Sequence, residues 1–587
     1  MQNLTPATVN VNVSHAYKRI LASAILILCT VLVYYPSLKV PFLLDDYGKI
    51  IVNPDIKNLD NIPSRLIYPY ESPPNFHRND PSRPLTYLTL TVNYYFSQLK
   101  PDGYHIVNIA IHGLVVLLIF ALASLVFPMA GVNGIVLPFL SALFFAVHPV
   151  NVNVVTYVIG RAASLATLFY VSAVILFIQA RRGVKWGIFA SAICFVLALA
   201  SNQVALTLPA VILVTDFCFF SEGDPRRVTR NWNQHGVYWG LLAIYLGMRL
   251  AYFGKLGDVE ASIPVANQMD YILTQWVVLW KYASMTILPT GLSFEYLYGP
   301  LNHLNDPRVL VATVLYGILC VGIMRGLKSA WLSMSFGLFS VLWFLITLSP
   351  TSSVFPTTAT MAENRVYLPL VGLCLIIPFV ANAAIRRIAA EGYRNVVLLT
   401  VFGAYVVALG YITLRRNILY QDPIGLWTDV IQRYPNHERA HKNLALAFRA
   451  QGQFNQAADE CEKALVLDPG DFDARNNLAA FYYEMGRYKD SLAAYREIVK
   501  EKPDYAAAYS NMGMAYEQLK NVDAAMNAYQ NAIRLNPMLI EPLNNLGGLY
   551  LAKGRLREAA ALYQAALEID PHNAVILKNY KKVSANK

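Results

Sequence analysis

Charged residues are scarce in this chain of 587 amino acids: they make up 14% of it, while hydrophobic residues make up 56%. An ordinary soluble enzyme needs a charged surface, so this composition excludes that class and indicates a membrane protein. Cysteine is scarce too. The six thiols are scattered and form no CxxC pair, which argues against a disulfide framework and against a thiolate metal site.

Two familiar patterns are missing as well. The sequence has no G-x-x-x-x-G-K-[ST] or G-x-G-x-x-G loop, the usual cradles for nucleotide phosphates. No small-residue cleavage site follows the first apolar run, so residues 20–38 are expected to remain as a membrane span behind Lys18 and Arg19. The net charge of +11 lies almost entirely in the apolar part, because the last 152 residues hold 19 basic and 18 acidic side chains. A neutral soluble part argues against nucleic acid as a partner.

Apolar runs of roughly the 20-residue length that crosses a bilayer recur along residues 1–415. Transmembrane helices are predicted at residues 20–38, 104–127, 134–148, 162–180, 186–202, 204–220, 236–253, 308–325, 330–348, 366–385 and 395–414. Segments 83–98 and 270–289 are rich in Tyr, Thr, Gln or Trp and are predicted to lie at the membrane interface. The expected fold is an all-α bundle of about 11 crossings, with a first outer loop at 39–103.

Basic residues gather between these runs. With eleven crossings, five clusters that hold 13 Lys or Arg fall on one side of the membrane, which the positive-inside rule makes the cytoplasmic side. An odd number of crossings then places the C-terminal region on the outer face.

The C-terminal region repeats every 34 residues. One series of equivalent positions is Pro435, Pro469, Pro503, Pro537 and Pro571. The same register carries a small residue followed four positions later by an aromatic residue or Cys. This is the pattern of tetratricopeptide repeats, which are helix pairs that stack into an α-solenoid. Four repeats are predicted at 438–573, after a linker at 416–437 and before a capping tail at 574–587.

Each repeat carries an asparagine in the first helix of its pair, the helix that lines the concave groove of this fold. These residues are Asn443, Asn477, Asn511 and Asn545. Each could merely satisfy a neighbouring loop. Alternatively, the four amides form a ladder that binds the backbone of an extended acceptor polypeptide, since each amide has both a donor and an acceptor.

Two adjacent carboxylates, Asp45 and Asp46, lie a few residues beyond the first predicted span. Adjacent carboxylates repel each other, so the pKa of one tends to rise, which suits a general base or a metal ligand. Most such pairs are only turn residues or helix caps. This loop, however, is long, aromatic and rich in proline, unlike a plain connector.

Five motifs follow one another along the chain: FLLDDYGKIIVNPDI, RPLTYLTLTVNYYF, GYHIVNIAIH, HPVNVNVVTYVIGRAASL and LITLSPTSSVFPTTATMAENRVYLPLVGL. In them the chain resembles the GT-C polytopic glycosyltransferases with tetratricopeptide tails, especially the transmembrane-and-tetratricopeptide O-mannosyltransferase-like proteins and their bacterial relatives. The resemblance covers nearly the whole chain. It implies an enzyme that passes a sugar from a polyprenyl- or dolichyl-phosphate donor to a hydroxyl on the outer face of the membrane.

The resemblance also implies roles for individual residues. Asp45, slightly favoured, or Asp46 would be the base toward the acceptor hydroxyl. Arg365, with Arg161 as second choice, would contact the lipid phosphate, because a guanidinium fork matches phosphate geometry. Two weaker candidates for that contact, which could instead only snorkel from apolar helices, are Lys281 and Arg249. Supporting family positions fall on Glu363, Asn364, Tyr367, His105, His112 and His148, although a histidine at a helix end is more often structural.

The chain departs from the family at several positions. Asn151, Asn153 and Ala163 stand where relatives have His or Glu, and Asn202-Gln203 stands where they have Lys-Glu. The loss of three carboxylates weakens the case for a bound divalent metal, which is left unassigned. The departures also suit a different donor sugar or an enzyme that has lost activity.

The expected function is that of an inverting, lipid-phosphate-sugar-dependent glycosyltransferase acting on Ser or Thr of a protein that the repeat groove recruits. Its expected location is a bacterial inner membrane with the repeats in the periplasm, or alternatively the endoplasmic reticulum with the repeats in the lumen. Two other functions stay open. One is a non-catalytic membrane scaffold, and the other is an enzyme with the same donor chemistry that modifies a glycan or a lipid.

Overall fold

The computed structural model describes residues 6–570 and 573–584, except 54, 58–79, 81, 255–267, 302, 330 and 353–358. The described residues form helices and connecting turns without a β-strand, so the predicted all-α class is confirmed. They divide into two compact units, one ending at Asp422 and the other beginning at Pro423. The middle of the predicted first outer loop, residues 58–79, lies outside the described residues.

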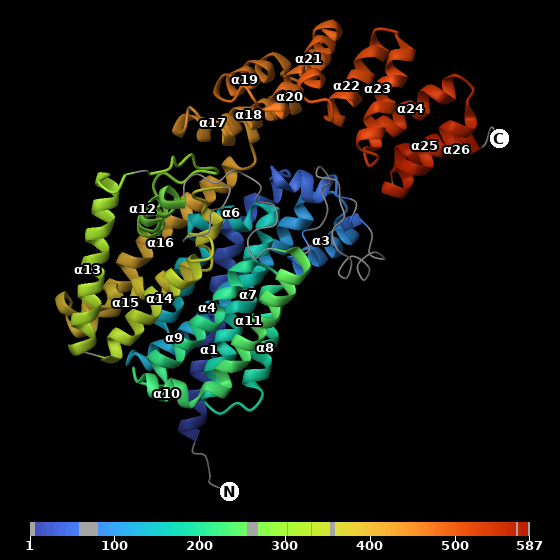
Figure 1. Cartoon of the computed structure of the whole chain (residues 1–587). Helices are drawn as coiled ribbons and strands as arrows, with labels where there is room; N and C mark the ends of the chain where they lie inside the picture. The colour runs from blue at the N-terminus through green and yellow to red at the C-terminus, as the bar shows by residue number, and fades with distance from the viewer. Residues whose placement is uncertain are drawn as a thin grey trace. The chain divides into compact units, whose positions relative to one another are not determined.

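The first unit begins with helices that lead to a short basic helix (Figure 1). In order, they are α1 (Pro6–Tyr34), η1 (Tyr35–Lys39), η2 (Tyr47–Ile51), η3 (Asp55–Lys57), α3 (Pro84–Ser97), α4 (Pro101–Met129), α5 (Val136–Ala146), η5 (Pro149–Asn151), α6 (Val152–Val155), η6 (Val158–Gly160), α7 (Arg161–Arg181), α8 (Gly187–Leu199), η7 (Gln203–Thr207), α9 (Leu208–Phe219) and α10 (Pro225–Arg230). Proline opens several of these helices because the first helical residue needs no hydrogen-bonded N–H.

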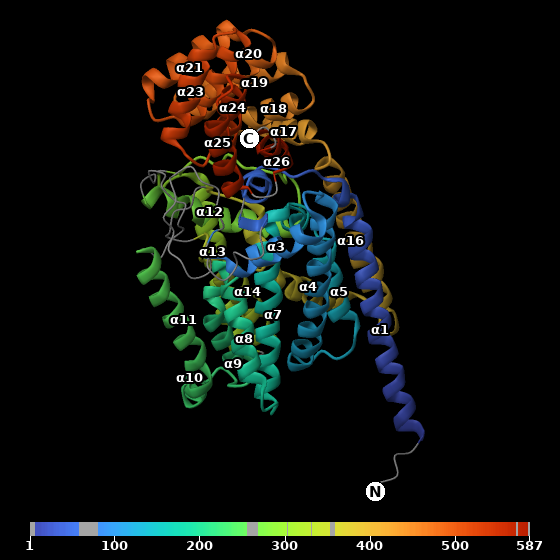
Figure 2. The same ribbon diagram turned by 90° about the vertical axis from the view of Figure 1, so that its right-hand side faces the viewer.

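The remaining helices of the first unit complete the bundle (Figure 2). They are α11 (Trp232–Phe253), α12 (Gln268–Ile287), α13 (Pro307–Ser329), α14 (Trp331–Leu348), η8 (Glu363–Val366), α15 (Leu370–Ile388), η9 (Glu391–Tyr393) and α16 (Arg394–Leu419). Within the bundle, α4 packs against α1, α5 and α7, and α7 packs also against α8 and α9. The core of the unit therefore surrounds α4 and α7, whose facing side chains are buried.

A helix lies in each of the eleven predicted spans. By length and composition, the described helical segments able to cross a membrane are Ala16–Lys39, Pro101–Met129, Val158–Arg181, Leu370–Ile388 and Glu391–Leu419. The segments Val136–Ala146 and Pro149–Val155, bent by 44°, count as one more span if they form a broken helix. Shorter apolar helices lie at Gly187–Leu199, Gln203–Phe219, Pro307–Gly322 and Met334–Leu348. The chain is thus a membrane protein, while the number of eleven crossings stays a prediction.

The second unit begins with α17 (Pro423–Arg433) and continues as helix pairs. The pairs are α18 (Glu438–Ala450) with α19 (Phe454–Leu467), α20 (Phe472–Glu484) with α21 (Tyr488–Glu501), α22 (Ala506–Gln518) with α23 (Val522–Leu535), and α24 (Ile540–Ala552) with α25 (Leu556–Ile569). The last described helix is α26 (Ala574–Ser584). This succession confirms the predicted solenoid of tetratricopeptide repeats.

Small residues let the two helices of a repeat approach each other. A Cβ atom added to Gly513 would lie 2.4 Å from the ring of Tyr529, and one added to Gly547 would lie 2.9 Å from the ring of Tyr563. The equivalent position of α26 is Lys581. Because a lysine there leaves no room for such a ring, Lys581 fits the predicted role of α26 as a capping helix, which stays a prediction.

Candidate active site

The acidic pair follows a residue with strained backbone. Leu44 has a φ of 42°, in the left-handed region that residues other than glycine rarely adopt. Asp45 and Asp46 come next, directly before η2. Strain of this kind persists only where surrounding contacts hold it, and it clusters at functional sites.

The two carboxylates lie in different surroundings. Asp46 is 1% exposed, and its oxygens accept hydrogen bonds from the backbone N–H groups of Leu43 (3.0 Å) and Ile159 (3.0 Å). Asp45 is exposed. The structure thus leaves Asp45 open to a substrate, while Asp46 fastens the segment before η2 to the turn before α7.

The turn between α6 and η6 also holds Asp45. The hydroxyl of Tyr157 accepts a hydrogen bond from the backbone N–H of Asp45 (2.9 Å) and hydrogen-bonds its side chain. Tyr157 was not among the predicted site residues, although it lies inside the HPVNVNVVTYVIGRAASL motif, two residues before Ile159. Its position in that motif was the available signal.

The surroundings of Asp46 change its acidity. Burial raises the pKa of Asp46 to about 7, against the opposing effect of backbone hydrogen bonds from Leu43, Ile159 and Val158, and the nearby charge of Asp45 adds to the rise. An aspartate in an unfolded chain loses its proton near pH 4 (about 3.9). Between about pH 4 and pH 7 the folded protein therefore binds one more proton than the unfolded chain at this position.

This difference predicts a stability that falls with rising pH. Relative to an Asp46→Asn variant, we expect the thermal unfolding midpoint of the parent to drop as pH rises from about 4 to about 7 and to stay level above that. Scanning fluorimetry at several pH values measures the difference. Infrared difference spectra should show a protonated carboxyl group near neutral pH that the variant lacks. A parent-to-variant difference that does not change with pH would contradict the prediction.

Arg161 lies beside the acidic pair but is closed to a ligand. It is 0% exposed, and its guanidinium donates to Oδ1 of Asn108 (2.7 Å), to Oδ1 of Asn93 (2.7 Å) and to backbone oxygens of α3 and α4. Its charge interacts with that of Asp46. These bonds tie α7 to α3 and α4, so the geometry favours a positioning role for Arg161 over the predicted contact with a donor phosphate.

A second buried polar cluster surrounds Glu363 at the start of η8. The carboxylate accepts hydrogen bonds from the hydroxyl of Tyr296 (2.6 Å) and the backbone N–H of Ser293 (3.1 Å), and it forms an ion pair with Arg416 (2.8 Å). Arg416 also donates to the backbone oxygen of Pro149 (2.7 Å). The cluster therefore joins η8, α16, η5 and the loop between α12 and α13.

The loop between α12 and α13 connects this cluster to the acidic pair. The ring of Phe294 packs edge-on against Tyr157, with the ring centroids 5.9 Å apart. The neighbouring Ser293 donates to Glu363. Two predicted site segments that are far apart in sequence, around Asp45 and around Glu363, are thus joined through one loop.

Arg365, the first choice for a phosphate contact, is half-buried in η8. Its guanidinium donates to the backbone oxygens of Thr351 (3.1 Å), Ala359 (2.5 Å) and Thr360 (3.4 Å). Helix α12 holds the same segment, because Gln275 donates to the oxygen of Thr360 (2.8 Å). Arg365 thus shapes the loop before η8, and its role toward a phosphate stays a prediction.

The two weaker phosphate candidates differ in their surroundings. Lys281 is half-buried on α12, and its ammonium has no ion-pair partner in the described part of the chain. Arg249 is 3% exposed on α11 and donates to the hydroxyl of Tyr245 (3.3 Å). Of these two cations, Lys281 is the more accessible to a ligand.

The histidines at family positions bind main-chain oxygens. In each case Nε2 of the histidine lies within hydrogen-bond distance of a backbone oxygen. The pairs are His105 with Val40 (2.9 Å), His148 with Thr286 (2.9 Å) and His112 with Ala146 (3.2 Å). Since a carbonyl oxygen can only accept, Nε2 carries the proton in each. Nδ1 of neutral His112 then accepts from the hydroxyl of Tyr367 (2.6 Å). His105, His148 and Tyr367 therefore have structural contacts, and their supporting roles stay predictions.

The neutral positions that depart from the family have contacts of their own. Asn151 is buried and donates to a backbone oxygen of α5 (2.8 Å), Asn153 donates to the backbone oxygen of Phe294 (3.4 Å), and Asn202 accepts from a backbone N–H of η7 (3.1 Å). Within the described ranges, no three His, Cys, Asp or Glu side chains lie close enough to share a metal ion. The metal therefore stays unassigned.

Part of the predicted asparagine ladder is engaged inside the second unit. Asn511 donates to Oδ1 of Asn476 in the preceding repeat (3.1 Å), and Asn545 donates to the hydroxyl of Tyr529 (3.4 Å). The register continues to Asn579 of α26, which the sequence analysis did not include.

The other two rungs have free amides. Among the described residues, the side chains of Asn443 and Asn477 have no hydrogen-bond partner. An unpaired amide has a donor and an acceptor left for a ligand. These two asparagines are therefore the unpaired part of the ladder, and Nδ2 of Asn443 is buried.

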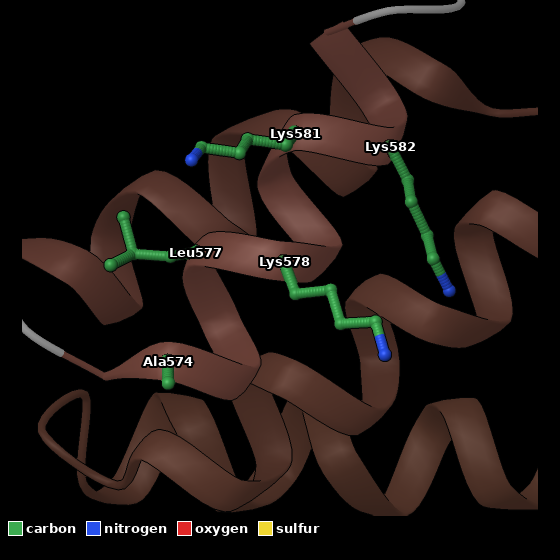
Figure 3. A pocket seen from close by; sticks show the side chains of 5 residues that line it. All are labelled: Ala574, Leu577, Lys578, Lys581 and Lys582. Atoms are coloured by element: carbon green, nitrogen blue, oxygen red, sulfur yellow. The ribbon is translucent and has the colours of Figure 1, made fainter.

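A shallow hollow lies on α26, and none of the predicted site residues lines it. Figure 3 shows its lining, which consists of Ala574, Leu577, Lys578, Lys581 and Lys582. The three lysines lie on one helix and make this a basic surface. Its lining holds no carboxylate, histidine, serine or cysteine to act together with these lysines, so it offers no alternative catalytic group of residues.

Comparison with known proteins finds tetratricopeptide repeats in the second unit and similar proteins over about three quarters of the chain. Models of the tetratricopeptide repeat match residues 420–472, 448–510, 506–539 and 540–573. Over 458 residues the chain is 27% identical to protein O-mannosyl-transferase F38B6.6 of Caenorhabditis elegans, and over 512 residues it is 22% identical to protein O-mannosyl-transferase Tmtc3 of Drosophila melanogaster. The chain is thus similar in sequence to proteins named protein O-mannosyl-transferases. The predicted resemblance is confirmed.

The aligned region covers a larger share of this chain than of either O-mannosyl-transferase. It covers 76% of this chain and 62% of the worm protein, and 75% of this chain and 54% of the fly protein. The chain thus spans less than two thirds of either relative. Among solved structures, MamA is similar over 26% of this chain and 88% of its own, with 25% identity and a TM-score of 0.23.

Proposed function

We propose that this chain is a membrane-bound glycosyltransferase that moves a sugar from a polyprenyl- or dolichyl-phosphate to a Ser or Thr hydroxyl of a protein. The names of the relatives make mannose the sugar that we propose. One observation carries the proposal. An exposed carboxylate, Asp45, is held in a strained turn by the motif that contains Tyr157 and Ile159.

The chemistry needs one displacement. The carboxylate of Asp45 accepts the proton of the acceptor hydroxyl as its oxygen attacks the anomeric carbon of the sugar. The new C–O bond forms while the bond between that carbon and the phosphate oxygen breaks, and its electron pair leaves with the lipid phosphate. A single displacement of this kind inverts the anomeric centre.

The leaving phosphate gathers negative charge, and a fixed cation stabilises it. Arg365 and Lys281 are the cations that we propose for this task, because both are partly exposed. Arg161 instead positions the turn that carries Tyr157 and Ile159. Its hydrogen bonds to Asn93 and Asn108 support that role.

The reaction would take place at the outer edge of the bilayer, where a lipid-linked donor meets a protein acceptor. The two locations inferred from the sequence, a bacterial inner membrane and the endoplasmic reticulum, share this geometry. The animal origin of both relatives supports the second location.

The direct test is transfer by the purified full chain in lipid vesicles. The donor is polyprenyl-phosphate mannose and the acceptor a Ser/Thr-rich peptide, and mass spectrometry reads the product. We expect a peptide that gains one hexose. Transfer to a lipid or a glycan instead would favour the enzyme that modifies such an acceptor. No transfer to any acceptor would favour the non-catalytic scaffold. The scaffold is supported by Asn151 and Asn153, which replace the His and Glu of the relatives.

The repeats would supply the acceptor by raising its local concentration. Replacing Asn443 and Asn477 together by Ala is expected to weaken binding of an unstructured Ser/Thr/Pro/Ala peptide about tenfold, since each lost hydrogen bond is worth about 0.5–1.5 kcal/mol. Fluorescence anisotropy of a labelled peptide on the full chain measures this.

A control variant separates the ladder from general damage to the repeats. Asn531→Ala removes an amide that donates to Asn527 within α23 (2.8 Å), the second helix of its pair. We expect it to leave peptide binding unchanged. Equal weakening by the control and by the ladder variant would contradict a role of the ladder in binding.

A further inference from the structure

Tyr157 contacts Asp45 although it lies 112 residues later in the sequence. Its hydroxyl accepts from the backbone N–H of Asp45 (2.9 Å) and hydrogen-bonds the carboxylate of the same residue. One phenol thus holds both the main chain and the side chain of Asp45. An exposed aspartate without such a contact could rotate among several rotamers.

The phenol is itself held in place. Tyr157 is 8% exposed, and its ring packs edge-on against Phe294 at 5.9 Å between centroids. Phe294 in turn packs edge-on against Tyr420, with centroids 5.2 Å apart. Because Tyr157 is buried and its ring packs within this chain of aromatic contacts, its hydroxyl is held in place beside the acidic turn.

The main chain around Tyr157 is fixed by a second set of contacts. Asn108 of α4 donates to the backbone oxygen of Val158 (3.3 Å) and accepts from Arg161 (2.7 Å). Gly160 allows the turn to fold this closely, because a Cβ atom at Gly160 would lie 2.5 Å from the backbone oxygen of Val154. The turn is therefore a rigid support.

We propose that Tyr157 is a positioning residue that aims the Asp45 carboxylate at the acceptor hydroxyl, an inference that rests on the proposed function. The proton moves from the acceptor to Asp45 and not to Tyr157. The phenol donates a hydrogen bond throughout and undergoes no net change. Misplacing a catalytic group by about 1 Å can lower the rate a hundredfold, so the loss of this contact should act on the rate of transfer.

The test is Tyr157→Phe in the full chain, reconstituted with polyprenyl-phosphate mannose and the Ser/Thr-rich peptide. The ring and its packing against Phe294 remain, and only the hydroxyl is lost. We expect kcat to fall about tenfold to a hundredfold, with KM for donor and peptide and the thermal midpoint unchanged. Tyr238→Phe is the matched control, because it removes a buried hydroxyl that donates to Ser191 (2.7 Å) between α11 and α8. This control should transfer at the parent rate.

A second measurement does not depend on transfer. Carbodiimide labelling of Asp45, followed by mass spectrometry, reports how freely its carboxylate reacts. We expect labelling to be several-fold faster in Tyr157→Phe than in the parent and unchanged in Tyr238→Phe.

The outcomes separate the two proposals. If Tyr157→Phe keeps the parent kcat while Asp45→Asn is inactive, the positioning role is overturned and the proposed function stands. If the parent transfers no sugar, the proposed function fails. In that case labelling of Asp45 at the same rate in Tyr157→Phe and the parent overturns the contact as well.

Discussion

Sugar transfer is expected to fall about 10²- to 10⁴-fold when Asp45 is replaced by Asn, the loss typical of removing a general base. The amide has nearly the size of the carboxylate, and the hydrogen bond from the backbone N–H of residue 45 to Tyr157 remains available. The loss should therefore appear in the chemical step. Single-turnover transfer from polyprenyl-phosphate mannose in vesicles measures it, with peptide binding as a parallel readout that should not change.

The control for this variant is a carboxylate outside the acidic turn. Asp102 is exposed at the start of α4, where it accepts a hydrogen bond from the N–H of Gly103 (2.9 Å). Asp102→Asn should transfer at the parent rate. A normally folded Asp45→Asn protein with parent activity would end the proposal that Asp45 is the base.

The Arg416→Met variant is expected to lower the stability of the first unit by about 3–5 kcal/mol, because it leaves the carboxylate of Glu363 buried without its ion-pair partner. Glu363 is fully buried and Arg416 largely so, and the pair is 2.8 Å long. The substitution also removes the hydrogen bond to Pro149. A dye that reacts with thiols follows unfolding, since Cys218 and Cys374 are buried in the folded unit.

Two further variants show whether the effect comes from the buried charge. Adding Glu363→Gln to Arg416→Met should recover part of the lost stability, because the unpaired charge is then gone. Arg308→Met breaks an exposed pair of the same length with Asp306 (2.8 Å), and exposed pairs contribute only about 0–1 kcal/mol. Equal losses from Arg308→Met and Arg416→Met would show that burial does not matter here.

The repeats were the most predictable part of the fold. Their 34-residue register recurs in sequence because each helix pair must present the same small and aromatic positions to its neighbours. Gly513 against Tyr529 is an example of this local rule. The membrane helices were predictable for a similar reason, since each long apolar run satisfies its backbone hydrogen bonds within itself.

The contacts of the candidate site were less predictable. Asp45 and Asp46 look alike in sequence, and only the approach of Ile159 buries one carboxylate while the other stays exposed. Tyr157 lay inside a recognised motif, yet nothing in that motif says which of its side chains faces the acidic pair. Arg416 lies two residues beyond the last predicted span (395–414), where a basic residue ordinarily marks only the membrane boundary.

Periodic and compositional features, such as apolar length, repeat spacing and the order of motifs, were determined by the sequence alone, because they depend on residues that are near one another along the chain. Only the tertiary structure decided three other features. These are which carboxylate of the acidic pair is exposed, that Arg161 is buried away from ligands, and that Arg416 is the ion-pair partner of Glu363. Each of these depends on burial and on contacts between segments far apart in sequence, and burial sets the energy of a charge.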